Sequence, residues 1–475
     1  MSQLLNLSNY ADGIYAPVHD ERSDTRLKVI GELPSELSGA FVQNSPNPKF
    51  TPLGHPHWFD GDGMVHAVHV QGGQASYTNR WIHTDGLARD VAAGGATSSG
   101  ILMPVDFDRE GGPDKNTANT DLTWHNGKLL ALWWLGGAPY ELSLPDLRTV
   151  GVETFGETLS CGIAAHPKVD PRTRELVFFD YDVYRKPYMR YGVVSADGRV
   201  KTVQDIDLAH PSLLHDIAIT ENHTILLDFP MRYDAAKLAA GKRRVSFDRD
   251  APSRYGIIAR AGGDIRWFEG PACYAYHTVN AWEEHTVDGT VIVMLACRID
   301  DPIPRTPHER EPHIPRLTFL RLEPFLHEWR FNLSTGQMTE RQLDDVRTEF
   351  PRMNDNLLGE KARFAYHPRV AEEPTLLFDA VVRYDLERSS SETYEFGADR
   401  FSSEVCFAPC RGATSEDDGW LVSLVNDRRH ATSELVVLDA RDITAGPVAR
   451  VCIPRRVPVG FHAHWVAGHE IGAAI

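Results

Sequence analysis

The strongest constraint on the fold is a succession of short β-rich runs, each ended by turn residues. The runs are rich in aliphatic and aromatic residues, and Asn-Gly, Asp-Gly and Gly-Gly pairs between runs are typical of β-hairpins. The clearest runs lie at 129–135, 175–183, 224–229, 289–297, 375–385, 419–427, 433–439 and 447–454. Helical periodicity is scarce, and 234–244 is the best candidate for a short helix. The sequence therefore predicts antiparallel sheets.

A closed all-β architecture follows from the many predicted strands. They do not alternate regularly with helices, which argues against a parallel βαβ sheet. Antiparallel strands expose their edges unless the arrangement closes on itself, as in a β-propeller. At about 40–50 residues per blade, the 475-residue chain has room for seven blades and elaborated loops, although no clear repeat fixes that number. We expect a long Pro-, His- and charge-rich loop at 300–317 and, because no linker divides the chain, a single domain over 1–475.

Charge and composition exclude several classes of protein. The net charge of −17 argues against a nucleic-acid partner, and no basic stripe opposes that reading. The N-terminal residues lack a signal-peptide pattern, and the aliphatic run at 291–296 is too short to span a bilayer. Six cysteines without a Cys-x-x-Cys pair fit reduced thiols. We therefore expect a cytoplasmic protein, whose oligomeric state the sequence does not indicate.

Four of the 21 histidines stand in apolar settings at or near predicted strand ends: His166, His215, His277 and His462. A buried imidazole needs partners for both nitrogens, so one isolated case is best explained as a satisfied core residue. Four cases on separate strands can instead converge on a propeller axis and bind a metal ion. Neutral nitrogens suit iron, zinc or copper, and no HExxH motif selects zinc.

His464 follows His462 by two positions, in the stretch GFHAHW. In an extended strand both side chains point to the same face, so geometry does not choose between them. Metal-binding histidines usually donate their second N–H to a carboxylate or carbonyl. Glu349, in TEFPRMND, and Glu404, in FSSEVCFAP, are candidates for that role, and solvated strand residues are an equally good interpretation of both.

These stretches, taken together, resemble the carotenoid cleavage oxygenase family almost from end to end. The resemblance rests on GELPSELSGAFVQNSPNP, HWFDGDGMVHAV, NTANTDLTWHNGKLLAL, GIAAHPKVDPRTRELVFF, LLHDIAIT, IRWFEGPACYAYHTVNAWEE, TEFPRMN, EDDGWLVSLVND and RVPVGFHAHW. It implies a seven-bladed β-propeller with a cap of loops and short helices over the active-site face. It also implies an iron(II) ion on the propeller axis and no catalytic side chain beyond the iron centre.

The resemblance also assigns roles to the candidate residues. Carried over position by position, the iron-binding histidines of the family fall on His166, His215, His277 and His462. His464 becomes a neighbour of the site. Glu349 and Glu404 match two of the glutamates that support the ligands. A third glutamate of the family falls on Leu135, which implies that His215 uses water or another acceptor.

The family adds dioxygen across a conjugated carbon–carbon double bond and releases two carbonyl products. The resemblance thus implies a non-haem iron(II) dioxygenase acting on an apolar alkene, and the glycines at 91–100 fit no phosphate loop. Thr120 matches a residue that crowds an open iron position in some members, with an ordinary strand threonine as the alternative. Phe59, Trp134 and Leu135 are further candidates for residues lining the substrate site.

Trp134 bears on the choice of substrate. Members of the family that cleave hydroxystilbenes often carry a lysine at this position, whereas the indole of Trp134 favours a carotenoid or apocarotenoid as substrate. Packing in the protein core explains Trp134 and Phe59 equally well. A stilbene-cleaving enzyme and a non-catalytic polyene-binding propeller are the alternatives, and Leu135 keeps the second one open. The segment 235–245 carries Lys242, Arg243 and Arg244 beside aliphatic residues, and it fits either peripheral membrane contact or a solvated surface helix.

Overall fold

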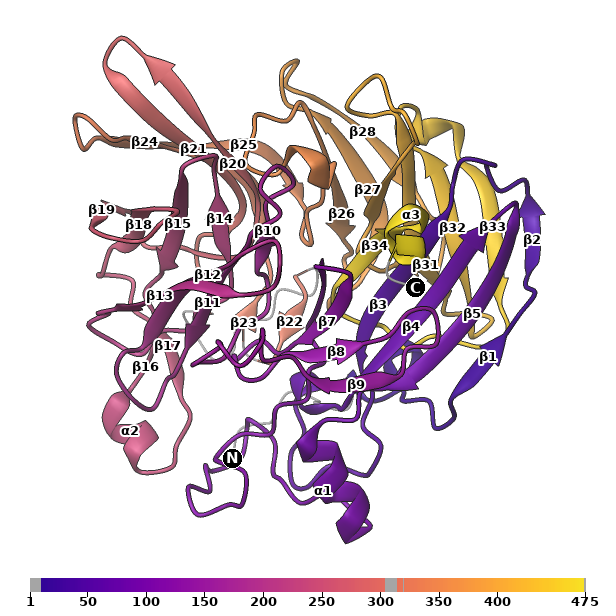
Figure 1. Ribbon diagram of the computed structural model, residues 1–475, viewed down its shortest axis with the longest axis horizontal. Coiled ribbons are helices and arrows are strands. Elements are labelled where there is room, and N and C mark those ends of the chain that lie inside the picture. Colours follow the sequence, from indigo (N-terminus) through magenta and orange to yellow (C-terminus); the bar gives the residue numbers. More distant parts are fainter. Residues whose placement is uncertain (1–9, 304–313, 319, 474–475) are drawn as a thin grey trace.

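The computed structural model describes residues 10–303, 314–318 and 320–473. Within these ranges the chain forms a seven-bladed β-propeller whose sheets follow one another around the molecule in chain order (Figure 1). Most of the loop expected at 300–317 lies outside the described residues, as does the start of the chain. The last two residues of the predicted loop form the short strand β22 (Arg316–Leu317), which pairs with β23 (Leu320–Arg321) in a two-stranded sheet.

Four blades are separate four-stranded antiparallel sheets. They comprise β6 (Asp121–His125), β7 (Lys128–Leu132), β8 (Tyr140–Leu142) and β9 (Thr149–Val152); β10 (Lys168–Val169), β11 (Leu176–Tyr181), β12 (Met189–Val194) and β13 (Val200–Ile206); β14 (Ile217–Ile219), β15 (His223–Asp228), β18 (Ser253–Ala259) and β19 (Ile265–Gly270); and β20 (Tyr274–Thr286), β21 (Gly289–Ile299), β24 (Phe325–Asn332) and β25 (Met338–Arg347). The eight predicted β-rich runs each contain a strand, which confirms that part of the sequence interpretation.

The next two blades are joined by strand pairing into one larger sheet. They comprise β26 (Phe364–Val370), β27 (Phe378–Asp385), β28 (Ser390–Glu395) and β29 (Arg400–Ser402), followed by β30 (Cys406–Pro409), β31 (Gly419–Asp427), β32 (Thr432–Asp439) and β33 (Pro447–Ile453), with β2 (Lys28–Gly31) at the outer edge. The pairing of β29 with both β27 and β31 connects the two blades.

The last blade closes the ring with strands from both ends of the chain. It comprises β34 (Ala463–Ala467), β3 (Gly39–Pro46), β4 (Gly63–Gln71), β5 (Gln74–Trp81) and β1 (Arg22–Asp24). β34 runs antiparallel to β3, with Phe41 opposite Trp465. Closure covers the strand edges that an open sheet would expose. Neighbouring blades also cover both faces of a sheet, which is why every residue of β3 and β11 is buried.

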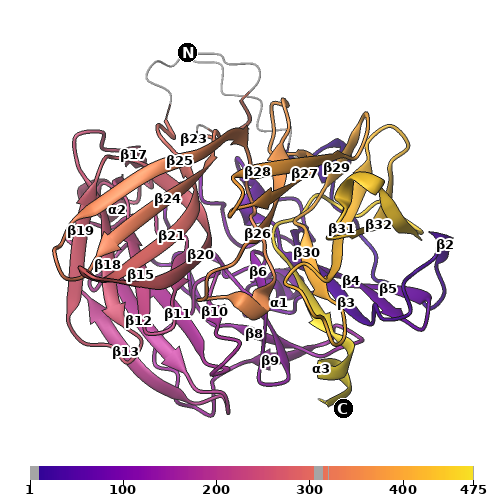
Figure 2. The same ribbon diagram turned by 90° about the horizontal axis from the view of Figure 1, so that it is seen from above.

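Short elements cover one face of the ring. They include η3 (Trp58–Asp60), β16 (Met231–Tyr233), α2 (Ala235–Ala239), β17 (Val245–Phe247), β22 and β23. In Figure 2, β17 and β23 lie at one side of the ring and α3 (Gly468–Ala473) lies at the opposite side. The remaining elements are α1 (Asp85–Ala93), η2 (Gly13–Tyr15), η4 (Asp355–Leu357) and η5 (Ile443–Ala445). No helix in the described ranges is long and apolar enough to cross a membrane.

The helices differ from the sequence prediction in two ways. α2 is shorter than the predicted 234–244, because Gly241 takes a left-handed conformation (φ +76°) directly after the cap at Ala240. α1 was not predicted. Its start is capped by Thr84, whose Oγ1 accepts a hydrogen bond from the Leu87 N–H.

Candidate metal centre

Four buried histidines converge at the centre of the ring. His166 and His215 lie just before the inner strands β10 and β14, His277 lies in β20, and His462 directly precedes β34. These inner strands belong to four different blades, so residues distant in sequence meet where the blades meet. One potential ligand nitrogen from each imidazole lies within 4.8 Å of all the others, and no ring is more than 8% exposed. The structure thus brings together the four histidines singled out in the sequence.

The four imidazoles fit a single metal ion. The Nε2 atom of His166 is buried and has no hydrogen-bond partner among the described residues, and Nε2 of His215 lies 3.2 Å from Nε2 of His277. Burial lowers the pKa values of these three rings, with the neighbouring imidazoles adding to the effect, so their lone pairs are free. Nitrogens at roughly 2.1 Å from an ion are at most about 4.2 Å apart, close to the observed spread. Buried lone pairs that face one another need a cation between them.

Two glutamates orient two of the rings. Nδ1–H of His277 donates to Oε2 of Glu349 (2.5 Å), and Nδ1–H of His462 donates to Oε1 of Glu404 (3.2 Å). Oε2 of Glu404 also accepts from the backbone N–H of Ala463 (2.6 Å). These bonds leave the Nε2 lone pairs directed at the centre of the cluster.

The two carboxylates differ in their electrostatic settings. Burial raises the pKa of Glu349 to about 8. Burial acts on Glu404 in the same direction, but the charges of Arg352 and His462 and the hydrogen bonds to the carboxylate outweigh it and lower its pKa to about 2. Glu404 is therefore ionised at neutral pH and stabilises positive charge at His462, whose pKa is raised although burial opposes this.

Two further carboxylates, which the sequence interpretation missed, hold the backbone at the ligands. Oδ2 of Asp121 accepts from the N–H of His166 (3.0 Å), which fixes a residue with a left-handed φ of +66°. Oδ2 of Asp216 accepts from both N–H (2.7 Å) and Oγ1–H (2.8 Å) of Thr278, next to His277. Their signal in the sequence was an acid beside a candidate site residue, in ANTD and LLHD.

His215 and His166 have no carboxylate hydrogen-bonded to their rings in the described parts of the chain. The nearest approach to His166 is Oδ2 of Asp121, 3.9 Å from Nδ1 and too long for a hydrogen bond. Leu135 and His215 line the same cavity, and the Leu135 side chain offers no hydrogen-bond acceptor there. The use of water or another acceptor by His215 stays a prediction.

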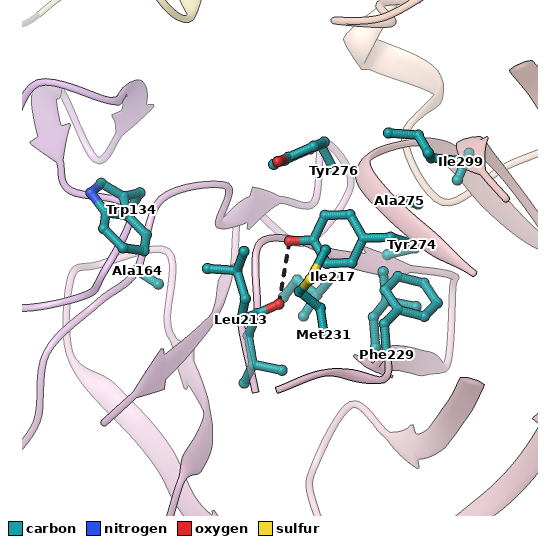
Figure 3. Close-up of a cluster of buried hydrophobic side chains, with 14 of the residues drawn as sticks. Trp134, Ala164, Leu213, Ile217, Phe229, Met231, Tyr274, Ala275, Tyr276 and Ile299 are labelled. Atoms are coloured by element: carbon teal, nitrogen blue, oxygen red, sulfur yellow. Dashed lines mark hydrogen bonds between the residues drawn. The ribbon is translucent and has the colours of Figure 1, made fainter. Parts of the chain in front are cut away.

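Two apolar cavities reach the histidines from the capped face. One, of about 40 Å³, is lined by residues that include Thr120, Phe350 and His277; the other, of about 90 Å³, has Trp134 and Leu135 in its wall. Phe59, His215, Tyr276 and Leu317 line both, so the cavities adjoin. Figure 3 shows three of the residues that line the larger one, Trp134, Leu213 and Tyr276. All four candidate lining residues named from the sequence, Phe59, Thr120, Trp134 and Leu135, line one or both cavities.

Thr120 and Phe59 have specific neighbours at this site. Oγ1 of Thr120 accepts from the backbone N–H of Trp134 (3.1 Å) and donates to Oδ1 of Asn119 (3.0 Å). The ring of Phe59 packs against Trp134 with centroids 5.7 Å apart, and against Phe461 at 5.0 Å. These contacts make an aromatic wall beside the imidazoles.

The structure places two residues, His464 and Arg243, for which the sequence allowed more than one role. His464 pairs with Val42 within the last blade, lies outside the four-histidine cluster, and lines a larger polar cavity on the α3 face together with His462. Arg243 does not belong to an exposed basic patch: its Nε–H donates to Tyr184 Oη (3.0 Å) and its guanidinium pairs with Asp114. Arg243 also lines the larger apolar cavity.

Comparison with known proteins identifies relatives over nearly the whole chain. Residues 15–467 match the family described as retinal pigment epithelial membrane protein. The chain is 34% identical to carotenoid 9,10(9',10')-cleavage dioxygenase 1 of Arabidopsis thaliana, over 98% of this chain and 90% of the relative. It is 32% identical to a carotenoid cleavage oxygenase of Mycobacterium tuberculosis, over 96% and 97% of the two chains.

Solved structures share the fold. The lignostilbene dioxygenase of Pseudomonas brassicacearum superposes with a TM-score of 0.86 at 29% identity, over 97% of this chain and 98% of that one. A mutant of the Synechocystis apocarotenoid oxygenase gives a TM-score of 0.84 at 25% identity, over 96% and 98%. With this likeness from end to end and a shared propeller, the chain belongs to the carotenoid cleavage oxygenase family.

Proposed function

We propose that the protein is a non-haem iron(II) dioxygenase that cleaves a conjugated carbon–carbon double bond of a carotenoid or apocarotenoid. Dioxygen is the second substrate, and each of its atoms ends in one of two aldehyde products. The observation that carries the proposal is the set of four buried imidazoles at the inner end of two apolar cavities. We further propose that 1–475 acts as one domain, because ring closure joins strands from both ends of the chain.

The assigned ligands are His166, His215, His277 and His462, supported by Glu349 and Glu404. Iron(II) held by these imidazoles would supply the redox chemistry with dioxygen that zinc cannot provide. Four neutral imidazoles do not themselves compensate the charge of the ion, and the ionised carboxylate of Glu404 lies behind His462.

The side chains of the apolar cavities bind and orient the alkene. Phe59 and Phe461 offer ring faces to a flat polyene, and Leu317 covers it from the cap. The wall excludes water from the double bond, which favours transfer of both oxygen atoms to carbon over competing reactions. Thr120 narrows the space beside His462, since both residues line the smaller cavity and the N–H of His462 donates to the Thr120 carbonyl (3.2 Å).

The walls favour a carotenoid or apocarotenoid over a hydroxystilbene. The phenolate oxygen of a hydroxystilbene needs a positively charged side chain as its partner. Among the described residues that line the two cavities, Arg243 is the only lysine or arginine. That guanidinium is already engaged by Asp114 and Tyr184. Trp134, buried at 5% exposure, adds apolar surface to the same wall.

An extended polyene is delivered most directly from a membrane surface, and we propose peripheral contact through the rim of the larger cavity. Leu102 lines that cavity and is 37% exposed, and Phe107, 48% exposed, packs against Tyr184 of the same wall. Lys242 and Arg244 are exposed near this rim. Co-sedimentation with anionic vesicles that weakens in L102S/F107S supports the contact, whereas equal sedimentation of variant and parent refutes it.

Aerobic incubation of iron(II)-loaded protein with a panel of carotenoids, apocarotenoids and stilbenes, read by mass spectrometry, tests the reaction. We expect aldehyde pairs from the polyenes and none from H462A. Cleavage of stilbenes alone would overturn the substrate assignment. Tight polyene binding with unchanged substrate after prolonged incubation with iron and oxygen would show a binding protein instead.

A further inference from the structure

A large cavity with several charged side chains in its wall, here termed the axial channel, approaches the histidines from the face opposite the apolar cavities. Its volume is about 750 Å³. Its outer wall includes the exposed residues Asp355, Arg411 and Ala413, and its inner end includes His166 and His462. Residues of α3 line it, whereas β22 and β23 line the apolar cavities, and Figure 2 places α3 and β23 on opposite sides of the ring. The cluster therefore lies between a polar path and an apolar one.

The two paths suit different solutes. The apolar cavities have volumes of about 40 and 90 Å³ and walls of mainly aromatic and aliphatic side chains. A divalent cation that entered there would lose its hydration shell without replacement, which is prohibitive in a medium of low dielectric constant. The axial channel offers room for water and carboxylate oxygens along its length. A hydrated cation therefore reaches the imidazoles at far lower cost through the channel.

Two potential metal-binding atoms lie at the inner end of the channel, one without a hydrogen-bond partner and one paired with a lysine. Nε2 of His166 has no hydrogen-bond partner in the described residues, and its residue is 7% exposed. Asp216, directly after the ligand His215, is 1% exposed at its side chain, and its Oδ1 lies 2.7 Å from Nζ of Lys168. The other oxygen, Oδ2, is held by Thr278. Oδ1 also accepts from the backbone N–H of Ile217 (2.7 Å), so the flexible Lys168 side chain is the partner of this oxygen that can swing away.

We propose that the axial channel is the entry path of the divalent metal ion and that the Lys168–Asp216 ion pair is its gate. When the Lys168 side chain swings outward, Oδ1 of Asp216 receives the incoming cation and passes it to the adjacent imidazoles. The positive charge of Lys168 opposes cation entry while the gate is closed. Asp355 at the outer end attracts cations and compensates Arg352, whose Nη2 lies 3.0 Å from its carboxylate. This inference rests on the metal site of the proposed function and not on the substrate.

The rate of cobalt(II) uptake by metal-free full-length protein tests the channel. Stopped-flow absorption of the cobalt centre reports binding without any need for dioxygenase activity. We expect Lys168→Met to accelerate uptake by roughly tenfold at low salt and by less at high salt. Asp355→Asn and Ala413→Trp should slow it by roughly threefold to tenfold through lost attraction and a narrowed mouth. Leu102→Trp, at the rim of the apolar cavity, is the matched control and should leave the rate unchanged.

Measuring the cobalt(II) dissociation constant at equilibrium shows whether a residue lies on the entry path of the ion or belongs to its binding site. A narrowed path slows uptake and release together, so Ala413→Trp should leave the cobalt(II) dissociation constant unchanged. The proposal is overturned if Leu102→Trp slows uptake while Ala413→Trp does not, or if Lys168→Met is not faster than the parent. Ala413→Trp and Asp355→Asn keep the test valid if Lys168→Met does not fold. Protein that takes up no cobalt(II) overturns the metal site as well, whereas uptake without alkene cleavage refutes only the dioxygenase function.

Discussion

Glu404→Gln is the change that most sharply probes how the protein supports its metal ligands. Glu404 is 3% exposed and accepts two hydrogen bonds, from Nδ1–H of His462 (3.2 Å) and from the N–H of Ala463 (2.6 Å). Glutamine offers one carbonyl oxygen, so its NH₂ group must face one of these two donors. The substitution also removes the negative charge that faces Arg352 and His462.

The expected loss follows from these two effects. Replacing the partner of a metal-binding histidine costs about 10–100-fold in metal affinity, or about 1.4–2.7 kcal/mol. Because the Glu404 carboxylate is buried and charged, we expect the upper half of that range. One buried donor left unpaired should also lower the free energy of unfolding of the metal-free protein by about 1–3 kcal/mol.

Competition with a chelator measures the affinity for iron(II) or cobalt(II), and urea unfolding measures stability. Glu328→Gln is the matched control, since Glu328 is 7% exposed and accepts from Nε of Arg341 (2.8 Å) on the blade that contains β24 and β25, outside the histidine cluster. The control should keep the metal affinity of the parent. If Glu404→Gln binds metal as tightly as the parent, or if both variants lose affinity equally, Glu404 does not support a ligand.

Three further predictions concern other parts of the site and the fold. His462→Ala should abolish stoichiometric metal binding while His464→Ala keeps most of it, as measured by elemental analysis of untagged protein; the reverse result would misplace the ligand. Thr120→Val should lower the free energy of unfolding by about 1–3 kcal/mol, because the buried N–H of Trp134 loses its acceptor, and an unchanged urea midpoint would contradict this. Burial raises the pKa of Asp180 to about 6. The folded parent therefore binds a proton more tightly than the unfolded chain, and its free energy of unfolding falls as pH rises from the ordinary aspartate pKa through this value. Asp180→Asn should therefore gain roughly 1–2 kcal/mol relative to the parent between pH ~5 and ~7.5 in urea unfolding, and a pH-independent difference would refute it.

The sequence was sufficient for the fold class because both faces of strands such as β11 are buried. That burial produces continuous apolar runs such as LVFFDY in β11 and VVLD in β32, which local inspection recognises. The number of blades and the closure of the ring could not be predicted from local sequence patterns. The pairing of β34 with β3 joins opposite ends of the chain, and only the family resemblance implied it. α1 was missed although its Thr84 cap and the left-handed Gly94 at its end are local signals.

Residues of the candidate site could be predicted from the sequence only where the residue and its immediate neighbours form a recognisable pattern. A histidine in an apolar run is conspicuous, whereas Asp121 and Asp216 act on backbone N–H groups of segments far away in the sequence. The direction of Arg243 also depends on a distant partner, Asp114, which no local pattern connects to it. The axial channel could not be predicted at all, because its wall is assembled from all parts of the ring.

We propose that the four imidazoles hold iron(II) for the insertion of both atoms of dioxygen into a polyene double bond. This is tested most directly by mass spectrometry of the two aldehydes formed by iron(II)-loaded protein under heavy-oxygen gas, trapped quickly before exchange with water. We expect one heavy oxygen atom in each product and no product from the His462→Ala variant. Label in only one of the two products, or equal cleavage by the variant, would contradict it.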